Sequence, residues 1–234
     1  MIGTILFGAF SMVFCILFCI FRAKKANVLS LALKTISSVC FILCGIFAIK
    51  TMGSNNVNLL IIAGLVLGLI GDIILDLKIM YPDQGNQYFI VGTSSFAIGH
   101  VFYFLAVLFY NTAVVPAIMP WNILICIGVA IVLTLGIMLP SKKLGLNFGK
   151  MIYIVALYSF ILTFMMAYAI SIAIFNPIFW IFAVGMIVFF LSDLVLSLQY
   201  FGGNTSKSLI YVNHILYYAA QILIAISVLF ITIA

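Results

Sequence analysis

The chain has 234 residues, of which 67% are hydrophobic and 6% are charged, and its mean hydropathy is +1.42. This composition excludes a soluble globular protein, because its surface would be one continuous apolar patch. The net charge of +6 does not indicate nucleic-acid binding, because the basic residues lie in short connections between apolar stretches. There they set orientation and meet anionic lipid headgroups. The sequence therefore predicts an integral membrane protein surrounded by membrane lipids.

Eight apolar stretches have the length of about 20 residues that a membrane-spanning helix needs. The first has no basic residue before it and Arg22 after it, so we expect a retained helix rather than a cleaved signal peptide. The expected spans are 2–22, 28–49, 57–78, 88–110, 117–139, 149–171, 177–200 and 208–233. The predicted fold is an all-α polytopic membrane bundle of about eight helices, with residues 1–234 forming one transmembrane domain.

The basic residues are distributed unevenly between the two ends of these spans. Nine of the ten lie in or near the connections that follow the first, third, fifth and seventh spans, and only Lys50 lies at the opposite end. Connections rich in Lys and Arg stay on the cytoplasmic side of a membrane. We therefore expect these four connections to be cytoplasmic and both termini to be outside, in a bacterial cytoplasmic membrane.

The third and seventh spans each carry an aspartate deep in apolar sequence, Asp72 and Asp193. An ionisable group inside a membrane costs about 2.5–3.5 kcal/mol on insertion scales, and it predicts a functional site. At a rise of 1.5 Å per residue, both lie about 9 Å from the cytoplasmic end of their helix. Asp72 follows Gly64 and Gly68 in steps of four, so the small residues and the carboxyl group share one face. Such a face packs on other helices, and Asp72 is expected to point into the protein.

Other polar residues lie at comparable depth and predict one pocket that opens toward the cytoplasm. Lys34 lies one or two turns inside the second span, and it could bind a phosphate, neutralise an aspartate or snorkel to the surface. His214 lies about 9 Å into the eighth span, and His100 lies deeper. Each histidine could support the acids or be a hydrogen-bonded core residue. Asp76, one turn nearer the cytoplasm than Asp72, is expected at the mouth of the pocket.

Two sequence patterns recur and suggest an internal duplication. A glycine precedes each of the two deep aspartates by eight residues, and a His-x-x-Tyr motif follows in the next span. The matched pairs are Gly64–Asp72 with Gly185–Asp193, and His100–Tyr103 with His214–Tyr217. They predict two parallel four-helix halves, 1–112 and 113–234, related by a pseudo-twofold axis along the membrane normal.

Asp72 and Asp193 are the predicted catalytic pair, because two carboxyl groups in a site of low dielectric can divide the roles of general acid and general base. A simpler alternative is that each pairs with Lys34 or a histidine and holds the bundle together. No compact zinc-ligand motif is present, so the sequence predicts neither a metal nor another cofactor. The rival function is a proton-coupled transporter or lipid carrier, which two halves with intramembrane acids also fit.

The polar motifs, taken in order, resemble the YhhN family of membrane proteins, whose characterised members are lysoplasmalogenases. The resemblance covers nearly the whole chain. It rests on Lys34, Gly71-Asp72, the Gly92/Thr93 to His100-x-x-Tyr103 motif, Gly185 to Ser192-Asp193, and Tyr217-Tyr218-Ala-Ala-Gln221. One departure is that family members often have Lys-Pro in the second helix, where this chain has Lys34-Thr35.

This resemblance implies that the chain hydrolyses the vinyl ether bond of lysoplasmalogens to a fatty aldehyde and a glycerophosphoethanolamine or glycerophosphocholine. A lysophospholipid is then the substrate, Asp72 and Asp193 are the catalytic acids, and Lys34 holds the phosphate. The resemblance and the helix faces together give a set of residues that orients water and the acids: His100, Tyr103, His214, Tyr217, Tyr218 and Gln221. Asp76 and Ser192 are further expected supporting or substrate-binding residues. The order of the two acids, the headgroup preference and the oligomeric state do not follow from the sequence.

Overall fold

A computed structural model describes residues 1–114, 119–203 and 206–231, with side chains described outside 112–120. Each of its eight long helices is long and apolar enough to cross a membrane, which confirms the predicted all-α polytopic bundle. The helices are α1 (Ile2–Arg22), α2 (Val28–Met52), α3 (Asn56–Met80), α4 (Gly85–Val114), α5 (Met119–Met138), α6 (Ile152–Phe175), α7 (Trp180–Tyr200) and α8 (Lys207–Ser227).

The helix ends differ from the expected boundaries at several places. A 3₁₀ helix, Pro82–Gln84, leads directly into α4, which therefore begins at Gly85, three residues before the expected start. Similar 3₁₀ turns, Gly149–Met151 and Pro177–Phe179, precede α6 and α7. The helix α8 ends at Ser227, because the amides of Leu229 and Phe230 bond three residues back, to the carbonyls of Ile226 and Ser227. The expected span boundaries at 117 and 233 lie outside the described residues.

Asparagine side chains begin two of the helices. Asn27 accepts a hydrogen bond of 2.9 Å from the Ser30 amide, and the Ser30 hydroxyl lies 3.1 Å from the Asn27 amide. Asn55 accepts a hydrogen bond of 2.8 Å from the Asn58 amide. These contacts satisfy amides that have no partner inside the helix, so α2 and α3 have fixed starts.

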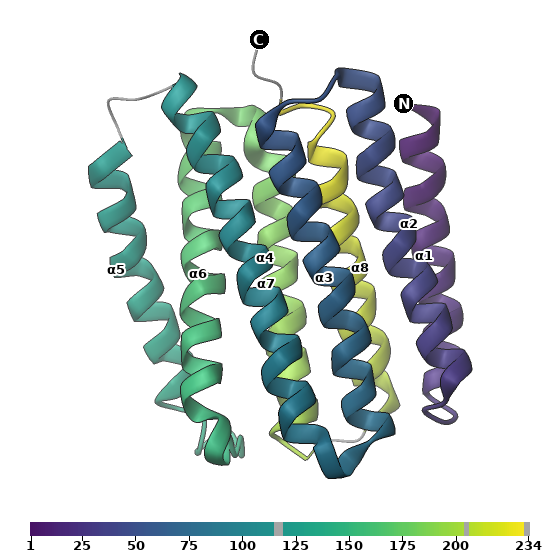
Figure 1. The fold of residues 1–234 in the computed structure, drawn as a ribbon. Coiled ribbons are helices and arrows are strands. Elements are labelled where there is room, and N and C mark those ends of the chain that lie inside the picture. The colour runs from purple at the N-terminus through teal and green to yellow at the C-terminus, as the bar shows by residue number, and fades with distance from the viewer. Residues whose placement is uncertain (115–118, 204–205, 232–234) are drawn as a thin grey trace.

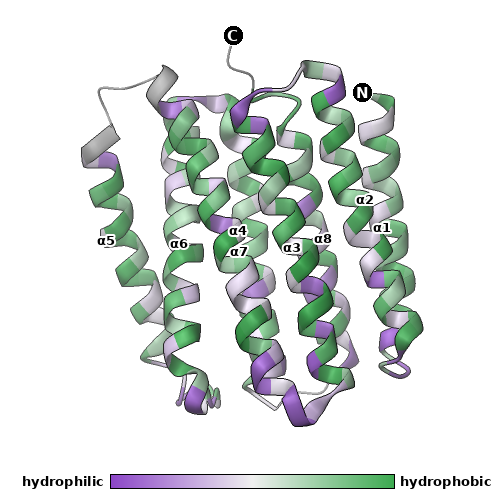
Figure 2. Ribbon diagram, in the orientation of Figure 1, coloured by the Kyte–Doolittle hydropathy of each residue, from purple (hydrophilic) through white to green (hydrophobic). Residues whose placement is uncertain are grey.

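The helices run side by side, and the start of α1 and the end of α8 lie at the same end of the bundle (Figure 1). The connections after α1, α3, α5 and α7 lie at the opposite end, which we call the basic end because it carries Arg22, Lys24, Lys25, Lys78, Lys142, Lys143, Lys150 and Lys207. Hydrophilic residues gather at the helix ends, and hydrophobic residues cover most of the helix length (Figure 2). This distribution matches the polar–apolar–polar layers of a bilayer.

The small residues of α3 let neighbouring helices approach closely, as the sequence predicts. A Cβ atom on Gly64 would lie 2.2 Å from the Tyr103 ring of α4, and one on Gly68 would lie 2.7 Å from Gln221 Nε2 of α8. Asp72 on the same face is 3% exposed, so it points into the protein. The glycines thus bring α4 and α8 against the helix that carries the acid.

The packing also bears on the suggested duplication. A Cβ atom on Gly185 of α7 would collide with Ile224 of α8, just as one on Gly64 would collide with Tyr103. Gly185 lies 121 positions after Gly64, and Ile224 lies 121 positions after Tyr103. Asp72 and Asp193 share this offset, but the two His-x-x-Tyr motifs are 114 positions apart. The two His-x-x-Tyr motifs are therefore shifted by seven residues from the register that the glycines and aspartates share. Seven residues are about two helical turns, so the shifted histidines still lie on the same helix face, and this explains why the motifs look matched. The two halves themselves stay a prediction.

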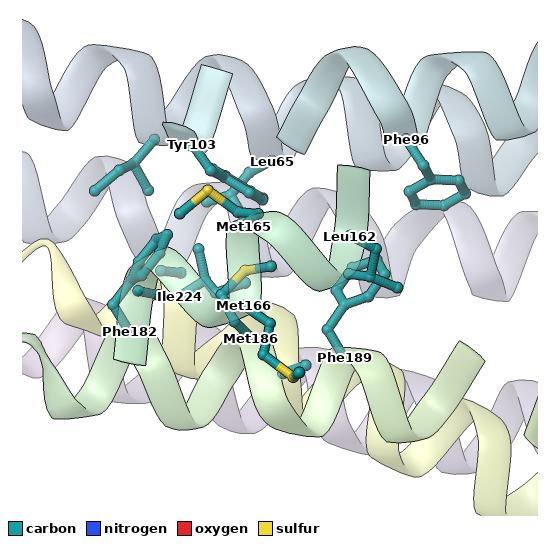
Figure 3. Close-up of a cluster of buried hydrophobic side chains, with 14 of the residues drawn as sticks. Leu65, Phe96, Tyr103, Leu162, Met165, Met166, Phe182, Met186, Phe189 and Ile224 are labelled. Carbon is teal, nitrogen blue, oxygen red and sulfur yellow. The ribbon is translucent and has the colours of Figure 1, made fainter. Parts of the chain in front are cut away.

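An apolar cluster fills the bundle toward the end opposite the basic end. Figure 3 shows Met165, Met186 and Phe182 packed together, with Leu65 and Ile224 nearby. All except Met165, which is 1% exposed, are fully buried. This cluster separates the polar residues of the basic half from the opposite end of the molecule.

Candidate active site

A cavity of about 500 Å³ lies in the half of the bundle nearer the basic end. Its volume is within the usual range for small-molecule sites, about 300–1,000 Å³. All eight helices contribute to its wall, through residues such as Arg22, Lys34, Asp72, Phe89, Ile137, Tyr158, Asp193 and His214. Polar residues from distant spans therefore converge on one pocket, as the sequence predicts for Lys34, Asp72, Asp76, Ser192, Asp193, His214 and Tyr217.

Asp72 is held by hydrogen-bond donors from two other helices. Its Oδ2 atom accepts bonds from the Ser38 hydroxyl at 2.6 Å and from the Tyr217 hydroxyl at 2.8 Å. Its Oδ1 atom lies 3.4 Å from the Lys34 ammonium. Hydroxyl donors and a cation thus surround the two oxygens of this carboxyl group.

Lys34 does not snorkel to the surface. It is 6% exposed, and its ammonium joins Asp76 at 3.1 Å as well as Asp72. Of the roles considered from the sequence, neutralising aspartates is the one the geometry shows. A lysine between two carboxylates ties α2 to α3 and balances charge that would otherwise be costly inside the membrane.

Asp76, which the sequence predicts at the mouth of the pocket, lines the cavity and is buried. It is 1% exposed, and both its oxygens accept bonds from the Arg22 guanidinium, at 3.0 and 3.2 Å. This bidentate pair joins the end of α1 to α3. Both oxygens of Asp76 are thus occupied by Arg22 and Lys34.

A chain of hydrogen bonds continues from Asp72 away from the cavity. The Tyr217 hydroxyl accepts a bond of 3.0 Å from Gln221 Nε2, and Gln221 Oε1 accepts one of 3.3 Å from the Tyr103 hydroxyl. Tyr218, on another face of α8, donates to the Lys34 carbonyl at 3.0 Å and contacts the Ser38 hydroxyl at 2.9 Å. Tyr103, Tyr218 and Gln221 do not line the cavity; they lie behind the residues that do.

Asp193 has different surroundings from Asp72. Its Oδ2 atom accepts a short hydrogen bond from the Tyr158 hydroxyl of α6. Within the described part of the chain it forms no salt bridge. Ser192 beside it is fully buried in the cavity wall, and its hydroxyl has no hydrogen-bond partner among the described residues. The cavity wall therefore contains two carboxyl groups beside cations, those of Asp72 and Asp76, and one without a cation, that of Asp193.

The two histidines occupy unlike positions. His214 lines the cavity, and its Nδ1 atom lies 2.8 Å from the Ile210 carbonyl while its ring packs against Phe18. His100 does not line the cavity: it is 1% exposed and packs among the rings of Tyr103, Tyr158 and Phe189. Neither of its ring nitrogens has a partner among the described residues. His100 is thus a core residue that contacts Tyr158, the partner of Asp193, and Tyr103, the last residue of the hydrogen-bond chain from Asp72.

The described residues contain no group of three or more side chains arranged to hold a metal ion. The five cysteines are buried and free. The side chains that line the cavity bring carboxyl, phenol, hydroxyl, imidazole, ammonium and guanidinium groups to it.

A model of the YhhN family matches residues 29–228 of the chain. The chain belongs to the YhhN family. The match begins with α2 and reaches just beyond the end of α8, so it includes every candidate residue named from the sequence. No curated protein and no solved structure matches the chain. The family resemblance seen in the motifs is thereby confirmed.

The structure adds three residues to the site that the sequence does not predict there: Arg22, Ser38 and Tyr158. Arg22 precedes the range that the family model matches, and its place at a helix end suggests only orientation. Ser38 and Tyr158 have no distinctive spacing. One signal in the sequence could have indicated Arg22. Three aspartates lie within the spans, but Lys34 is the only basic residue well inside a span, so a second cation is needed to balance the buried negative charge.

Proposed function

We propose that this protein is a membrane-embedded hydrolase that cleaves the vinyl ether bond of lysoplasmalogens. The observation that carries the proposal is the presence of two carboxyl groups with unlike partners in one cavity. Membership of the YhhN family supports the same activity. An acid and a base with different surroundings suit a reaction that needs both in one turnover.

The partners of the two acids support a division of roles that the sequence leaves open. Asp72, beside Lys34 and two hydroxyl donors, suits the ionised carboxylate that stabilises a cation and activates water. Asp193, whose partner is the neutral phenol of Tyr158, suits the protonated acid. We therefore propose Asp193 as the proton donor and Asp72 as the base.

In the proposed reaction Asp193 protonates the alkenyl carbon that is β to the ether oxygen, which produces an oxocarbenium ion. A water molecule adds to the adjacent carbon and gives one proton to Asp72, forming a hemiacetal. The hemiacetal loses its hydroxyl proton, the carbon–oxygen bond to glycerol breaks, and the glycerol oxygen takes up a proton. The products are a fatty aldehyde and a glycerophospho compound, and both carboxyl groups regain their starting protonation after proton exchange.

The remaining contacts support the positions of these groups. Tyr217, held by Gln221, orients Asp72, while Tyr158 orients Asp193. The cavity reaches Arg22, Ile79 and Phe201 at the basic end and continues inward to Phe96 and Leu162. A single-chain lipid can therefore place its headgroup at the basic end and its alkenyl chain among the apolar residues.

The test is aldehyde release from a lysoplasmalogen by the purified protein in detergent, with Asp72→Asn and Asp193→Asn in parallel. We expect each variant to lose activity by at least about 100-fold, the usual contribution of a general acid or base. Asp83→Asn is the matched control, because Asp83 is exposed near the start of α4 and is expected to keep wild-type activity. Melting temperatures of all variants separate loss of chemistry from loss of folding.

The absence of aldehyde from a folded wild-type protein, at several pH values and with both headgroups, would overturn the proposal. A proton-coupled transporter or lipid carrier would then be the leading alternative. That alternative predicts movement of lysolipid between the leaflets of a vesicle without its cleavage.

A further inference from the structure

The cavity closes toward the centre of the membrane soon after it passes Asp193. Its deepest lining residues on α7 and α6 are Phe190 and Leu162, each about 15 Å along the axis from the basic end of its helix. Asp193 lies only three residues from Phe190, about 4.5 Å along α7. Met186 and Met165 follow one turn deeper, 0% and 1% exposed, in the apolar cluster that fills the bundle (Figure 3).

The interior beyond Asp193 is therefore too short for the hydrocarbon chain of a membrane lipid. Such a chain spans half of the bilayer core, about 15 Å. The interior offers it roughly one helical turn, about 5.4 Å, before the methionines. A chain that begins at Asp193 must leave the bundle sideways, into the bilayer.

Three seams between neighbouring helices are closed at this depth. Between α7 and α8, the rings of Phe189 and Tyr217 pack edge-to-face at 5.5 Å. Between α4 and α6, the ring of His100 lies 6.0 Å from that of Tyr158. The glycines of α3 let α4 pack directly against it. These contacts leave no passage for a chain through the three seams.

The seam between α6 and α7 is open on the side of α5. Ser159 of α6 and Phe190 and Leu194 of α7 line the cavity there, and each is half-buried. Ile137 of α5 also lines the cavity, although α5 lies at the edge of the bundle and packs against α6 (Figure 1). Because this peripheral helix contributes to its wall, the cavity extends past α6 and α7 to the outside of the bundle. We call the part lined by these four residues the lateral groove.

We propose that the alkenyl chain of the substrate leaves the bundle through the lateral groove, between α6 and α7, and ends in the bilayer. The inference rests on the proposed hydrolase function and adds to it the subsite that receives the chain. Leu194 adjoins Asp193 in α7, so the groove begins at the proposed proton donor. Since most of a long chain then lies in lipid, the protein does not measure its length, and long chains of different lengths are expected to be cleaved equally well.

The test compares two substrates with the same headgroup, one with a butenyl chain and one with a hexadecenyl chain. The interior alone can hold the butenyl chain, whereas the hexadecenyl chain needs the groove. Leu194→Trp fills the groove and is expected to raise KM for the hexadecenyl substrate about tenfold. Its KM for the butenyl substrate is expected to stay unchanged. Ser159→Leu narrows the groove from α6 and is expected to act in the same direction, so it decides the matter if Leu194→Trp does not fold.

Leu191→Trp is the matched control, because Leu191 lies on the same helix, is 43% exposed and does not line the cavity. It is expected to have the wild-type KM for both substrates. An unchanged KM for the hexadecenyl substrate in the folded groove variants would overturn the proposal. So would an equal rise of KM for both substrates, because the substitutions would then disturb the site and not the path of the chain.

The lateral groove can be tested separately from the reaction. The probe is a hexadecyl ether lysolipid, which has no vinyl ether bond to cleave, with a photoreactive diazirine in the middle of its chain. Labels around Ile137 and Leu194 that excess unlabelled lipid removes would support the groove even if the wild-type protein releases no aldehyde. Labels on Met165 or Met186, or labels that unlabelled lipid does not reduce, would overturn it.

Discussion

At the scale of single residues, the charges of the bundle depend on one another. Lys34 contacts Asp72 and Asp76, and Asp76 also binds Arg22 through both oxygens. Each of these four side chains is less than one-tenth exposed. Removal of one partner leaves an uncompensated charge in the interior, which is far more costly than the net contribution of the intact pair.

Arg22→Met is therefore expected to lower the free energy of unfolding by about 3–5 kcal/mol. The measurement is equilibrium or thermal unfolding in detergent. A double variant, Arg22→Met with Asp76→Asn, removes both charges and is expected to be more stable than the Arg22 variant alone. If the losses of unfolding free energy in Arg22→Met and in Asp76→Asn add up to the loss in the double variant, the bidentate pair does not stabilise the protein through charge compensation.

The hydroxyl of Tyr217 is expected to matter for activity more than for stability. Tyr217→Phe removes one of two hydroxyl donors to Asp72 and leaves Gln221 Nε2 without the partner it has at 3.0 Å. We expect kcat to fall about tenfold, as for the loss of one hydrogen bond to a charged group. Tyr153→Phe, at a position that is 85% exposed, is the matched control. Wild-type kcat in Tyr217→Phe would contradict the orienting role.

At the scale of helices, close packing depends on α3 having no side chain at particular positions. A Cβ atom on Gly64 would collide with the Tyr103 ring, whereas one on Gly128 of α5 would meet nothing within 4 Å. Gly64→Ala is expected to destabilise the protein by about 1–3 kcal/mol through overpacking. Gly128→Ala is expected to be neutral or stabilising by up to about 1 kcal/mol, because alanine favours a helix. Equal melting temperatures for the two variants would show that α3 and α4 can separate without cost.

The number and approximate position of the helices are the features that the sequence predicts best. A span needs about 20 apolar residues, and that requirement fixes the number and approximate bounds of α1 to α8. Hydropathy does not determine where a helix stops when apolar sequence continues, as it does after Ser227. Hydropathy also does not detect a shift of a motif by two helical turns. For this reason His100 and His214 look equivalent in the sequence but have different surroundings in the structure.

At the scale of the whole molecule, the sequence predicts which residues meet better than which atoms they contact. Asp72, Asp193 and Lys34 converge because polar groups at one depth in a membrane must face the protein interior. Their individual partners depend on helix rotation, which spacing within one helix does not give. The positions of Arg22, Ser38 and Tyr158 against the acids therefore become visible only in the assembled bundle.

The orientation of the bundle in the membrane decides from which side a lysolipid headgroup reaches the cavity. The cavity extends to the basic end, and the positive charge there predicts a cytoplasmic location. All five native cysteines are buried, so single cysteines introduced at exposed positions can report the topology. Ser54→Cys lies in the connection between α2 and α3, and Lys143→Cys lies in that between α5 and α6; both positions are exposed.

A membrane-impermeant maleimide added to intact cells is expected to label Ser54→Cys and not Lys143→Cys. Both should be labelled after the cells are permeabilised, and the wild-type protein gives the background. The reverse pattern in intact cells would place the basic end outside. The cavity would then take lipid from the outer leaflet, because it extends to the end of the bundle that the basic connections surround.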